Sequence, residues 1–184
     1  AAGVTSMTVS VPTRADGVSE ANETLYLNLS SATNATIADN QGLGTIMERI
    51  QAVPDAGTVY ESALSTGTLA SNTGETVTGN LLSNDFSPTT MAVNRVTFNG
   101  TNYSASGNVI TVDTPLGLLQ VYTTSGTYNG VARAAGDYVY TLQTNSTGGD
   151  SVSEQFSYRI TNGSTSSTAN LNVRIVDDAP VGSD

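Results

Sequence analysis

The chain has 184 residues, enough for one or two small domains, and its 16 acidic residues against 6 basic ones give a net charge of −10. It contains no Lys, His, Cys or Trp, which excludes a catalytic His or Cys, a Lys Schiff base, a Ser-His-Asp triad and the usual ligands of zinc. The negative charge disfavours nucleic acid as a partner, and without an 18-residue apolar run we expect no membrane insertion.

Apolar residues alternate with polar ones in short stretches, the period of two that is typical of half-buried antiparallel strands. No stretch shows a helical period over three turns. The predicted fold class is all-β, an antiparallel β-sandwich. In chain order, the predicted inward-facing sets are Met7, Val9 and Val11; Leu25, Leu27 and Leu29; residues 109–112; Leu119 and Val121; Tyr138, Tyr140 and Leu142; Phe156, Tyr158 and Ile160; and Leu171, Val173 and Ile175.

The stretch RIQAVPDAGTVYES, residues 49–62, predicts a boundary between domains, because Pro54 breaks a strand ladder and the next three residues resemble a connector. We predict one segment over residues 1–52, a domain over residues 53–178 and a linker over residues 179–184. The first segment is too short to hold a core alone. It must pack on the second domain or complete strands elsewhere in a longer chain.

Three acidic residues, Asp16, Glu20 and Glu23, come just before the predicted strand at residues 25–29. One interpretation is a solvated acidic turn. A catalytic carboxylate pair, as in glycosidases, is a second, but two acids on a loop are too common to support it. The third is a calcium site, since calcium takes oxygen ligands without His or Cys, and clustered acids without Lys repel each other unless a cation joins them.

The same reasoning makes candidates of five further acids, which lie at turns or strand ends. Their spacing does not match the EF-hand loop. Asp177 and Asp178 are adjacent, so on a strand they would point in opposite directions, but at a junction both could hold a cation together with backbone carbonyls. These candidate metal ligands are Asp85, Asp150, Glu154, Asp177 and Asp178.

Residues 1–46 resemble the second half of a Calx-β repeat. The resemblance rests on the D-x-x-x-E-x-x-E spacing of Asp16, Glu20 and Glu23, the alternating L-x-L-x-L-S stretch and the closing G-x-G-T-I. Calx-β modules are calcium-associated β-sandwiches, which implies a calcium role for those acids. The usual first half of the module, with part of its acidic loop, does not precede this stretch.

The remainder resembles the cadherin-like, immunoglobulin-like domains of large repeats-in-toxin (RTX) bacterial adhesins. The stretches that carry the resemblance are TGNLLSNDFSP at 78–88, TPLGLLQVYTTSGTY at 114–128, GDYVYTL at 136–142 and SEQFSYRITNGSTSSTANLNVRIVDDAP at 153–180. It implies a calcium-stabilised, non-enzymatic cell-adhesion module on the bacterial surface, with neighbouring domains of a longer chain as partners. It also implies type I secretion, in keeping with the absence of a visible signal peptide at AAGVTSMTV.

Two roles remain open for such a module: it binds a peptide or glycan on another cell, or it is an extender that holds a distant domain away from the surface. The two segments show no internal repeat, which favours ligand binding. The stretch 123–137 is predicted to be a long loop that offers Tyr128, Asn129 and Arg133 to a ligand, and Tyr103 is a further candidate. The lack of Trp disfavours a carbohydrate-enzyme accessory domain, and the lack of a regular Thr ladder disfavours ice binding.

Overall fold

The computed structural model describes residues 5–14, 22–47, 49–70, 73–147 and 152–178. It divides the chain into two units, unit 1 (Ala1–Glu48) and unit 2 (Arg49–Asp184). The division falls after Glu48 rather than after residue 52, because Ile50 is buried in the core of unit 2. The predicted linker at residues 179–184 lies outside the described residues. Among the described residues, no helix has the length and apolar character needed to cross a membrane.

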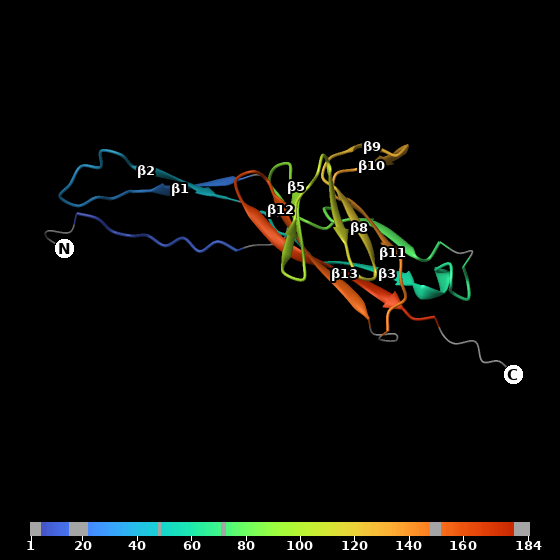
Figure 1. Cartoon of the computed structure of the whole chain (residues 1–184). Helices are drawn as coiled ribbons and strands as arrows, with labels where there is room; N and C mark the ends of the chain where they lie inside the picture. Colours follow the sequence, from blue (N-terminus) through green and yellow to red (C-terminus); the bar gives the residue numbers. More distant parts are fainter. Residues whose placement is uncertain (1–4, 15–21, 48, 71–72, 148–151, 179–184) are drawn as a thin grey trace. The chain divides into compact units, whose positions relative to one another are not determined.

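One layer of unit 2 is a five-stranded sheet (Figure 1). Its outer strand β3 runs parallel to β13, whereas the other neighbours are antiparallel. Side chains alternate between buried and exposed or half-buried along β12, as the period of two predicts. The strands, in order across the sheet, are β3 (Asp55–Tyr60), β13 (Ser166–Val176), β12 (Ser153–Thr161), β5 (Ala92–Phe98) and β6 (Thr101–Tyr103).

The second layer is a four-stranded antiparallel sheet. Its strands, in order, are β4 (Thr76–Asn80), β11 (Asp137–Leu142), β8 (Gly117–Tyr122) and β7 (Val109–Asp113). A short 3-10 helix, η1 (Glu61–Ala63), follows β3. The two sheets enclose one core, which makes unit 2 an antiparallel β-sandwich compatible with an immunoglobulin-like fold. The predicted all-β fold class is confirmed.

The core contains the inward-facing residues that the alternation predicts for unit 2. Tyr140 of one sheet and Phe156 of the other are fully buried, and their ring centroids lie 6.0 Å apart across the sandwich. Phe98 stacks on Phe156 from the neighbouring strand, with centroids 5.0 Å apart. Each fully buried side chain of this size contributes about 1.5–3 kcal/mol to folding. The predicted inward-facing sets of five strands of unit 2 are therefore confirmed.

The stretch 123–137 is not the long loop that we predicted. It contains a hairpin formed by β9 (Gly126–Tyr128) and β10 (Val131–Arg133). Asn129 and Gly130 connect the strands with φ values of 50° and 80°. Asn-Gly is the strongest short-range signal for such a tight hairpin turn, so these two residues, rather than the length of the stretch, decide its structure.

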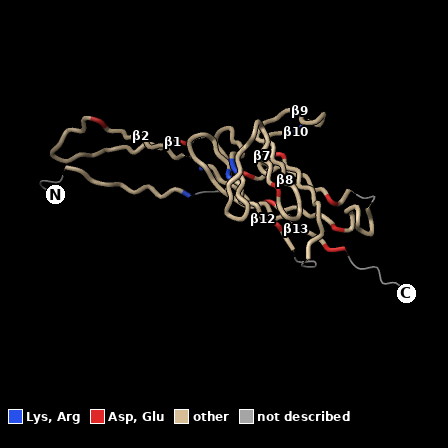
Figure 2. The backbone as a smooth tube through the Cα atoms, in the orientation of Figure 1, with Lys and Arg blue, Asp and Glu red and all other residues tan. Residues whose placement is uncertain are grey.

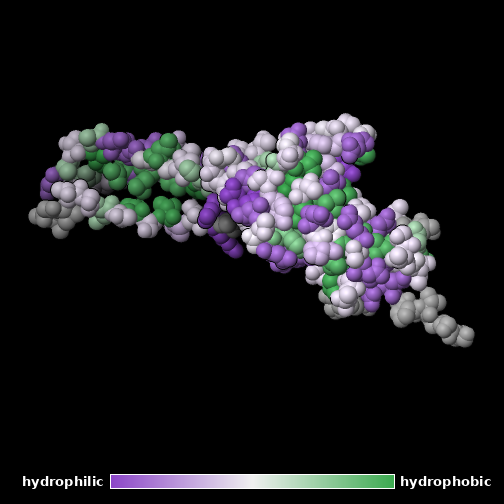
Figure 3. All heavy atoms as spheres, in the orientation of Figure 1, coloured by the Kyte–Doolittle hydropathy of each residue, from purple (hydrophilic) through white to green (hydrophobic). Residues whose placement is uncertain are grey.

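Unit 1 contains one antiparallel hairpin, β1 (Glu23–Asn28) with β2 (Gln41–Ile46). Tyr26 and Leu43 are more than half exposed, at 58% and 64%, and Figure 3 shows hydrophobic surface over this hairpin. The described residues 5–14, which include the predicted strand at Met7, form no strand. Alternation alone did not suffice there, because a strand also needs a partner for its backbone groups.

Candidate ligand-binding site

A notch interrupts the five-stranded sheet beyond the end of β5, beside the first residues of β12. The chain leaves β5 after Phe98 and turns at Asn99 and Gly100, which have φ values of 47° and 79°, into β6. β12 begins at Ser153 but pairs with β5 only from Ser157 onward. The first residues of β12 therefore have a strand neighbour on one side, β13, and none among the described strands on the other.

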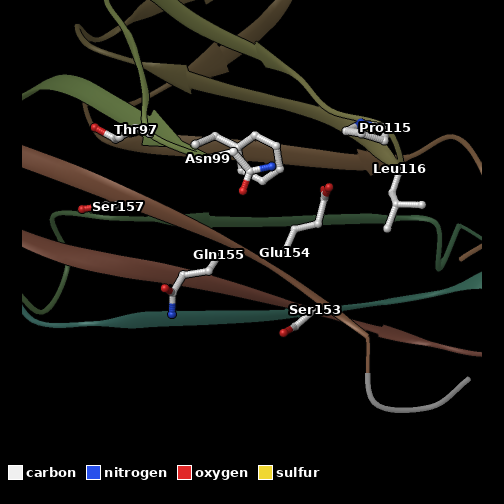
Figure 4. A pocket seen from close by; sticks show the side chains of 10 residues that line it. Thr97, Asn99, Pro115, Leu116, Ser153, Glu154, Gln155 and Ser157 are labelled. Carbon is white, nitrogen blue, oxygen red and sulfur yellow. The ribbon is translucent and has the colours of Figure 1, made fainter. Parts of the chain in front are cut away.

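A pocket of about 600 Å³ lies at this notch (Figure 4). The Glu154 side chain rises from β12 between Asn99 and Leu116, whereas the side chain of Gln155 points away from it. The lining includes one charged residue, Glu154, and otherwise consists of neutral polar and apolar residues. These are Thr97, Phe98, Asn99, Gly100, Pro115, Leu116, Ser153, Gln155 and Ser157.

Glu154 occupies an inward-facing position of β12 and is 6% exposed. Its Oε2 accepts hydrogen bonds from the Tyr140 hydroxyl at 2.7 Å and the Thr114 hydroxyl at 2.8 Å. Burial raises the pKa of Tyr140, and the hydrogen bond to Glu154 and the charge of Glu154 raise it further, so the hydroxyl remains a proton donor. Both donors are neutral, so they hold the carboxylate in place without cancelling its charge.

Two elements of the sequence keep these hydroxyls in position. The Thr114 hydroxyl also lies 2.9 Å from the carbonyl oxygen of Gly117, and it accepts from the backbone N–H of Gly117 at 2.8 Å. A Cβ at Gly117 would lie 2.5 Å from the Tyr140 hydroxyl and 2.5 Å from the carbonyl of Thr141. A glycine is therefore required where the start of β8 passes the phenol that contacts Glu154.

Asp85 is part of a separate polar cluster at the start of β3. Its Oδ1 accepts a hydrogen bond of 2.7 Å from the backbone N–H of Val53 and lies 3.3 Å from the Tyr158 hydroxyl. The same hydroxyl lies 2.8 Å from Asp55 Oδ2 and 2.7 Å from the carbonyl of Val53. Burial raises the pKa of Asp85 to about 6, and the charge of Asp55 adds to that rise. Burial also raises the pKa of Asp55 itself.

This cluster fastens the stretch 50–54, where the chain enters unit 2, to the loop after β4. Gln51 and Phe86 exchange two backbone hydrogen bonds of 2.9 Å. Asn84 donates to the carbonyl of Pro54 at 3.2 Å, beside the bond from Val53 to Asp85. The stretch Asn84–Asp85–Phe86 thus holds the entering chain by both side-chain and backbone bonds. Below we call this arrangement the entry clasp.

Asp177 and Asp178 lie at the other end of β3. Tyr60 pairs with Val176 at the ends of the parallel strands β3 and β13, so the residues that follow them leave the sheet side by side. Asp178 accepts hydrogen bonds of 2.8 Å from the backbone N–H and 2.6 Å from the hydroxyl of Thr68. The carboxylate of Asp178 therefore already has protein donors.

The structure does not bring the predicted metal ligands into one site. Glu23 is exposed at the start of β1, and Asp16, Glu20 and Asp150 lie outside the described residues. Figure 2 shows acidic positions at several separate places along the tube of unit 2. Within the part of the chain that the structure describes, no three carboxylates are close enough together to hold a metal ion.

Three of the four predicted ligand-binding residues lie on the β9–β10 hairpin, and the fourth lies on a strand of the other sheet. Tyr128 packs on the ring of Tyr122, with centroids 4.6 Å apart, and its hydroxyl lies within hydrogen-bond distance of the hydroxyl and the carbonyl of Thr124. The guanidinium of Arg133 lies 5.3 Å from the centroid of the Tyr122 ring. Asn129 forms the hairpin turn. Tyr103 belongs to the edge strand β6 of the other sheet and packs against the core.

Sequence reasoning missed the roles of Tyr140, Thr114, Tyr158 and Asp55. A signal was present, because the alternation that places Phe156 and Tyr158 in the core places Glu154 on the same face. A buried acid needs donors, and a buried Tyr usually finds a partner for its hydroxyl. A search against protein-family models finds no match for the chain, and a search of curated proteins finds none either.

Proposed function

We propose that the chain is a calcium-stabilised extracellular module of a bacterial surface adhesin and that it binds a ligand on another cell. The observation that carries the binding role is the pocket at the notch, with the buried carboxyl group of Glu154 in its wall. A concave site with few, well-held polar groups is the usual form of a binding site. The proposal of an adhesin rests on the resemblance of residues 78–180 to adhesin domains, together with the β-sandwich.

The end of unit 2 where β3 and β13 finish fits the calcium part of this proposal best. Glu61 and Asp177 follow the paired residues at this end, so their chains leave the sheet side by side. Glu75 Oε2 is buried without a hydrogen-bond partner, and the carbonyl of the preceding residue accepts from Tyr60 N–H at 2.9 Å. Calcium takes about six to eight oxygen ligands. Since no three carboxylates of the described residues lie close enough together to hold a metal ion, backbone carbonyls and water would have to supply most of these ligands.

An extender is the second candidate function, and the entry clasp favours it. Five hydrogen bonds tie residues 51–54 to the loop after β4 and to Tyr158, which restricts the chain where unit 2 begins. A restricted connection is what a spacer needs to transmit a fixed direction. An extender, unlike a binding module, would show no affinity for a cell-surface ligand through the notch.

Thermal melts of the full chain in EDTA, calcium and magnesium test the calcium role. Extracellular calcium sites have dissociation constants of about 10⁻⁴–10⁻³ M, and at about ten times that concentration one site adds about 1.4 kcal/mol. We expect calcium, but not magnesium, to raise the Tm by roughly 3–6 °C. Asp177→Asn should reduce this rise, whereas Asp113→Asn, an exposed control on β7, should not. Equal melts in calcium and EDTA would refute the calcium role.

Binding of the labelled chain to peptide and glycan arrays tests the adhesive role. We expect binding to a subset of ligands, reduced by Glu154→Gln and retained by Asp113→Asn. Glutamine keeps an oxygen to accept from Tyr140 and Thr114 but removes the charge. Absence of binding by the folded chain to every ligand, with calcium present, would favour the extender over the binding module.

A further inference from the structure

The notch exposes backbone groups of β12 as well as the Glu154 side chain. In an antiparallel pair, alternate residues direct both N–H and C=O toward the same neighbour. The N–H of Ile175 donates to the carbonyl of Val152 at 3.0 Å, and Glu154 is paired with Val173, so positions 152 and 154 face β13. Ser153 and Gln155 therefore direct their N–H and C=O to the opposite side, where no described strand pairs with them.

This edge lies in line with β5. Ser157 of β12 is paired with Thr97, and Phe156 stacks on Phe98, the last residue of β5. A strand that continued the line of β5 would place a residue directly opposite Glu154, on the inward face. Facing side chains in an antiparallel pair have Cβ atoms about 4.5–5.5 Å apart, so that side chain would meet the Glu154 carboxylate.

We propose that the notch binds a short extended peptide that carries a Lys or Arg side chain, by adding a strand to β12. This inference rests on the proposed function, whose ligand it narrows to a basic peptide. Backbone bonds to Ser153 and Gln155 hold the peptide, and Glu154 selects its basic side chain. The lining contains no cation to compete for Glu154, and the net charge of −10 attracts a basic segment.

The pocket fits a peptide better than a glycan. Sugar rings stack on exposed, flat aromatic faces, whereas the one aromatic ring of the lining, Phe98, is stacked on Phe156. The unpaired edge offers donors and acceptors at the spacing of alternate residues in a strand, which an extended peptide matches. The apolar residues Pro115 and Leu116 can cover the stem of a Lys or Arg side chain.

The test titrates the isotope-labelled full chain with the blocked peptide acetyl-Val-Thr-Lys-Thr-Val-amide and follows backbone amide signals by NMR. With Lys opposite Glu154, the two Thr residues lie opposite Ser153 and Gln155. We expect the amide signals of Ser153 and Gln155 to shift most. N-methylation of both Thr amides should abolish binding, whereas N-methylation of the Lys amide, which faces away, should leave it unchanged.

Peptides with norleucine or Glu in place of Lys test the role of Glu154. The norleucine peptide should bind about tenfold more weakly, the fold-change of one charge-assisted hydrogen bond. In Glu154→Gln the Lys and norleucine peptides should bind equally, while Asp113→Asn should keep the wild-type preference. The comparison of the three peptides on the wild-type chain needs no protein variant, because the change is made in the peptide.

Three results would overturn the inference: equal binding of the Lys and Glu peptides, binding that survives N-methylation of both Thr residues, or a glycan that displaces the peptide from the shifted amides. The outcome is separable from that of the proposed function. Binding of an array glycan elsewhere on the chain, with no shift of the Ser153 and Gln155 amides on addition of the peptide, would keep the adhesin and remove the peptide notch. Peptide binding by a chain whose Tm is the same in calcium and EDTA would support the peptide site at the notch and refute the calcium role.

Discussion

The hydroxyl of Tyr158 lies 3.3 Å from Asp85 Oδ1, the oxygen that already accepts the N–H of Val53. Tyr158 has one hydroxyl hydrogen, yet its oxygen lies within 2.8 Å of both the Val53 carbonyl and Asp55 Oδ2. The carbonyl of Val53 can only accept, so both short contacts form hydrogen bonds only when the Asp55 carboxyl group also carries a proton. Asp85 Oδ2 is buried with no hydrogen-bond partner. The entry clasp is therefore short of one proton when both acids are ionised.

This shortage predicts that acidification stabilises unit 2. Burial raises the pKa of folded Asp85 from 3.8 to about 6, so between these values the folded state binds more protons than the unfolded state. The free energy of unfolding therefore falls as the pH rises through about 6. About two pKa units correspond to at most about 3 kcal/mol. Urea unfolding between pH 4.5 and 7.5 measures this change.

Asp85→Asn isolates the contribution of this residue from that of the other acids. Asparagine keeps an oxygen for the Val53 N–H and carries no charge, so we expect a flatter pH profile and a gain of about 1 kcal/mol at pH 7.5. The other ionisable groups that face Asp85 are Asp55 and Tyr158. Asp113→Asn should keep the wild-type profile. A variant at position 85 with the full wild-type pH dependence would contradict this account.

Tyr158→Phe should loosen the entry clasp. The change removes the hydroxyl that lies against the Val53 carbonyl and Asp55, so the oxygen that accepts its one proton is left without that donor, at a cost of about 1–3 kcal/mol. Hydrogen exchange at Val53 should accelerate more than exchange in β11. Tyr60→Phe provides a matched control, because Tyr60 is 46% exposed. Equal acceleration in both regions would indicate a general loss of stability instead of a local opening.

Gly117→Ala should disturb the ligand pocket through Tyr140. The added Cβ would lie 2.5 Å from the Tyr140 hydroxyl and from a backbone carbonyl that cannot move freely. We expect a loss of about 1–3 kcal/mol in the free energy of unfolding and a weaker preference for the Lys peptide. Gly126→Ala is the control, since its Cβ would meet Tyr128 at an ordinary 3.4 Å. Unchanged stability of the position-117 variant would show that β8 can shift away.

The period of two in the sequence was sufficient to predict five strands of unit 2 and their buried faces, those of β7, β8, β11, β12 and β13, but it predicted no strand at β3, β4, β5 or β6. It succeeded because a strand buried on one face must alternate, whatever its partner. It failed at residues 5–14 and at Leu27, which is 39% exposed, because alternation does not say whether another sheet covers the face. The hairpin at Asn129–Gly130 was predictable from its turn residues.

The candidate site was less accessible to sequence reasoning. Glu154 was selected as an acid near a turn, but its partners Thr114 and Tyr140 come from separate parts of the chain. Which strands neighbour β12, and where β5 leaves it, depends on pairing over about 60 residues of sequence, which residue patterns alone do not specify. The notch exists because β5 ends opposite Phe156 and does not extend as far as Ser153, the first residue of β12. This depends on the register of the two strands.

Arg133→Gln separates the β9–β10 hairpin from the notch as the ligand site. Arg133 lies over the Tyr122 ring, so the change should cost about 0.5–1 kcal/mol of stability. Because the hairpin contributes no residue to the lining of the pocket, affinity for the Lys peptide should stay within twofold of wild type. The NMR titration described above measures this affinity, and urea unfolding measures the stability. A large loss of peptide affinity, with the amide shifts moving to residues 126–133, would place the ligand at the hairpin instead of at β12.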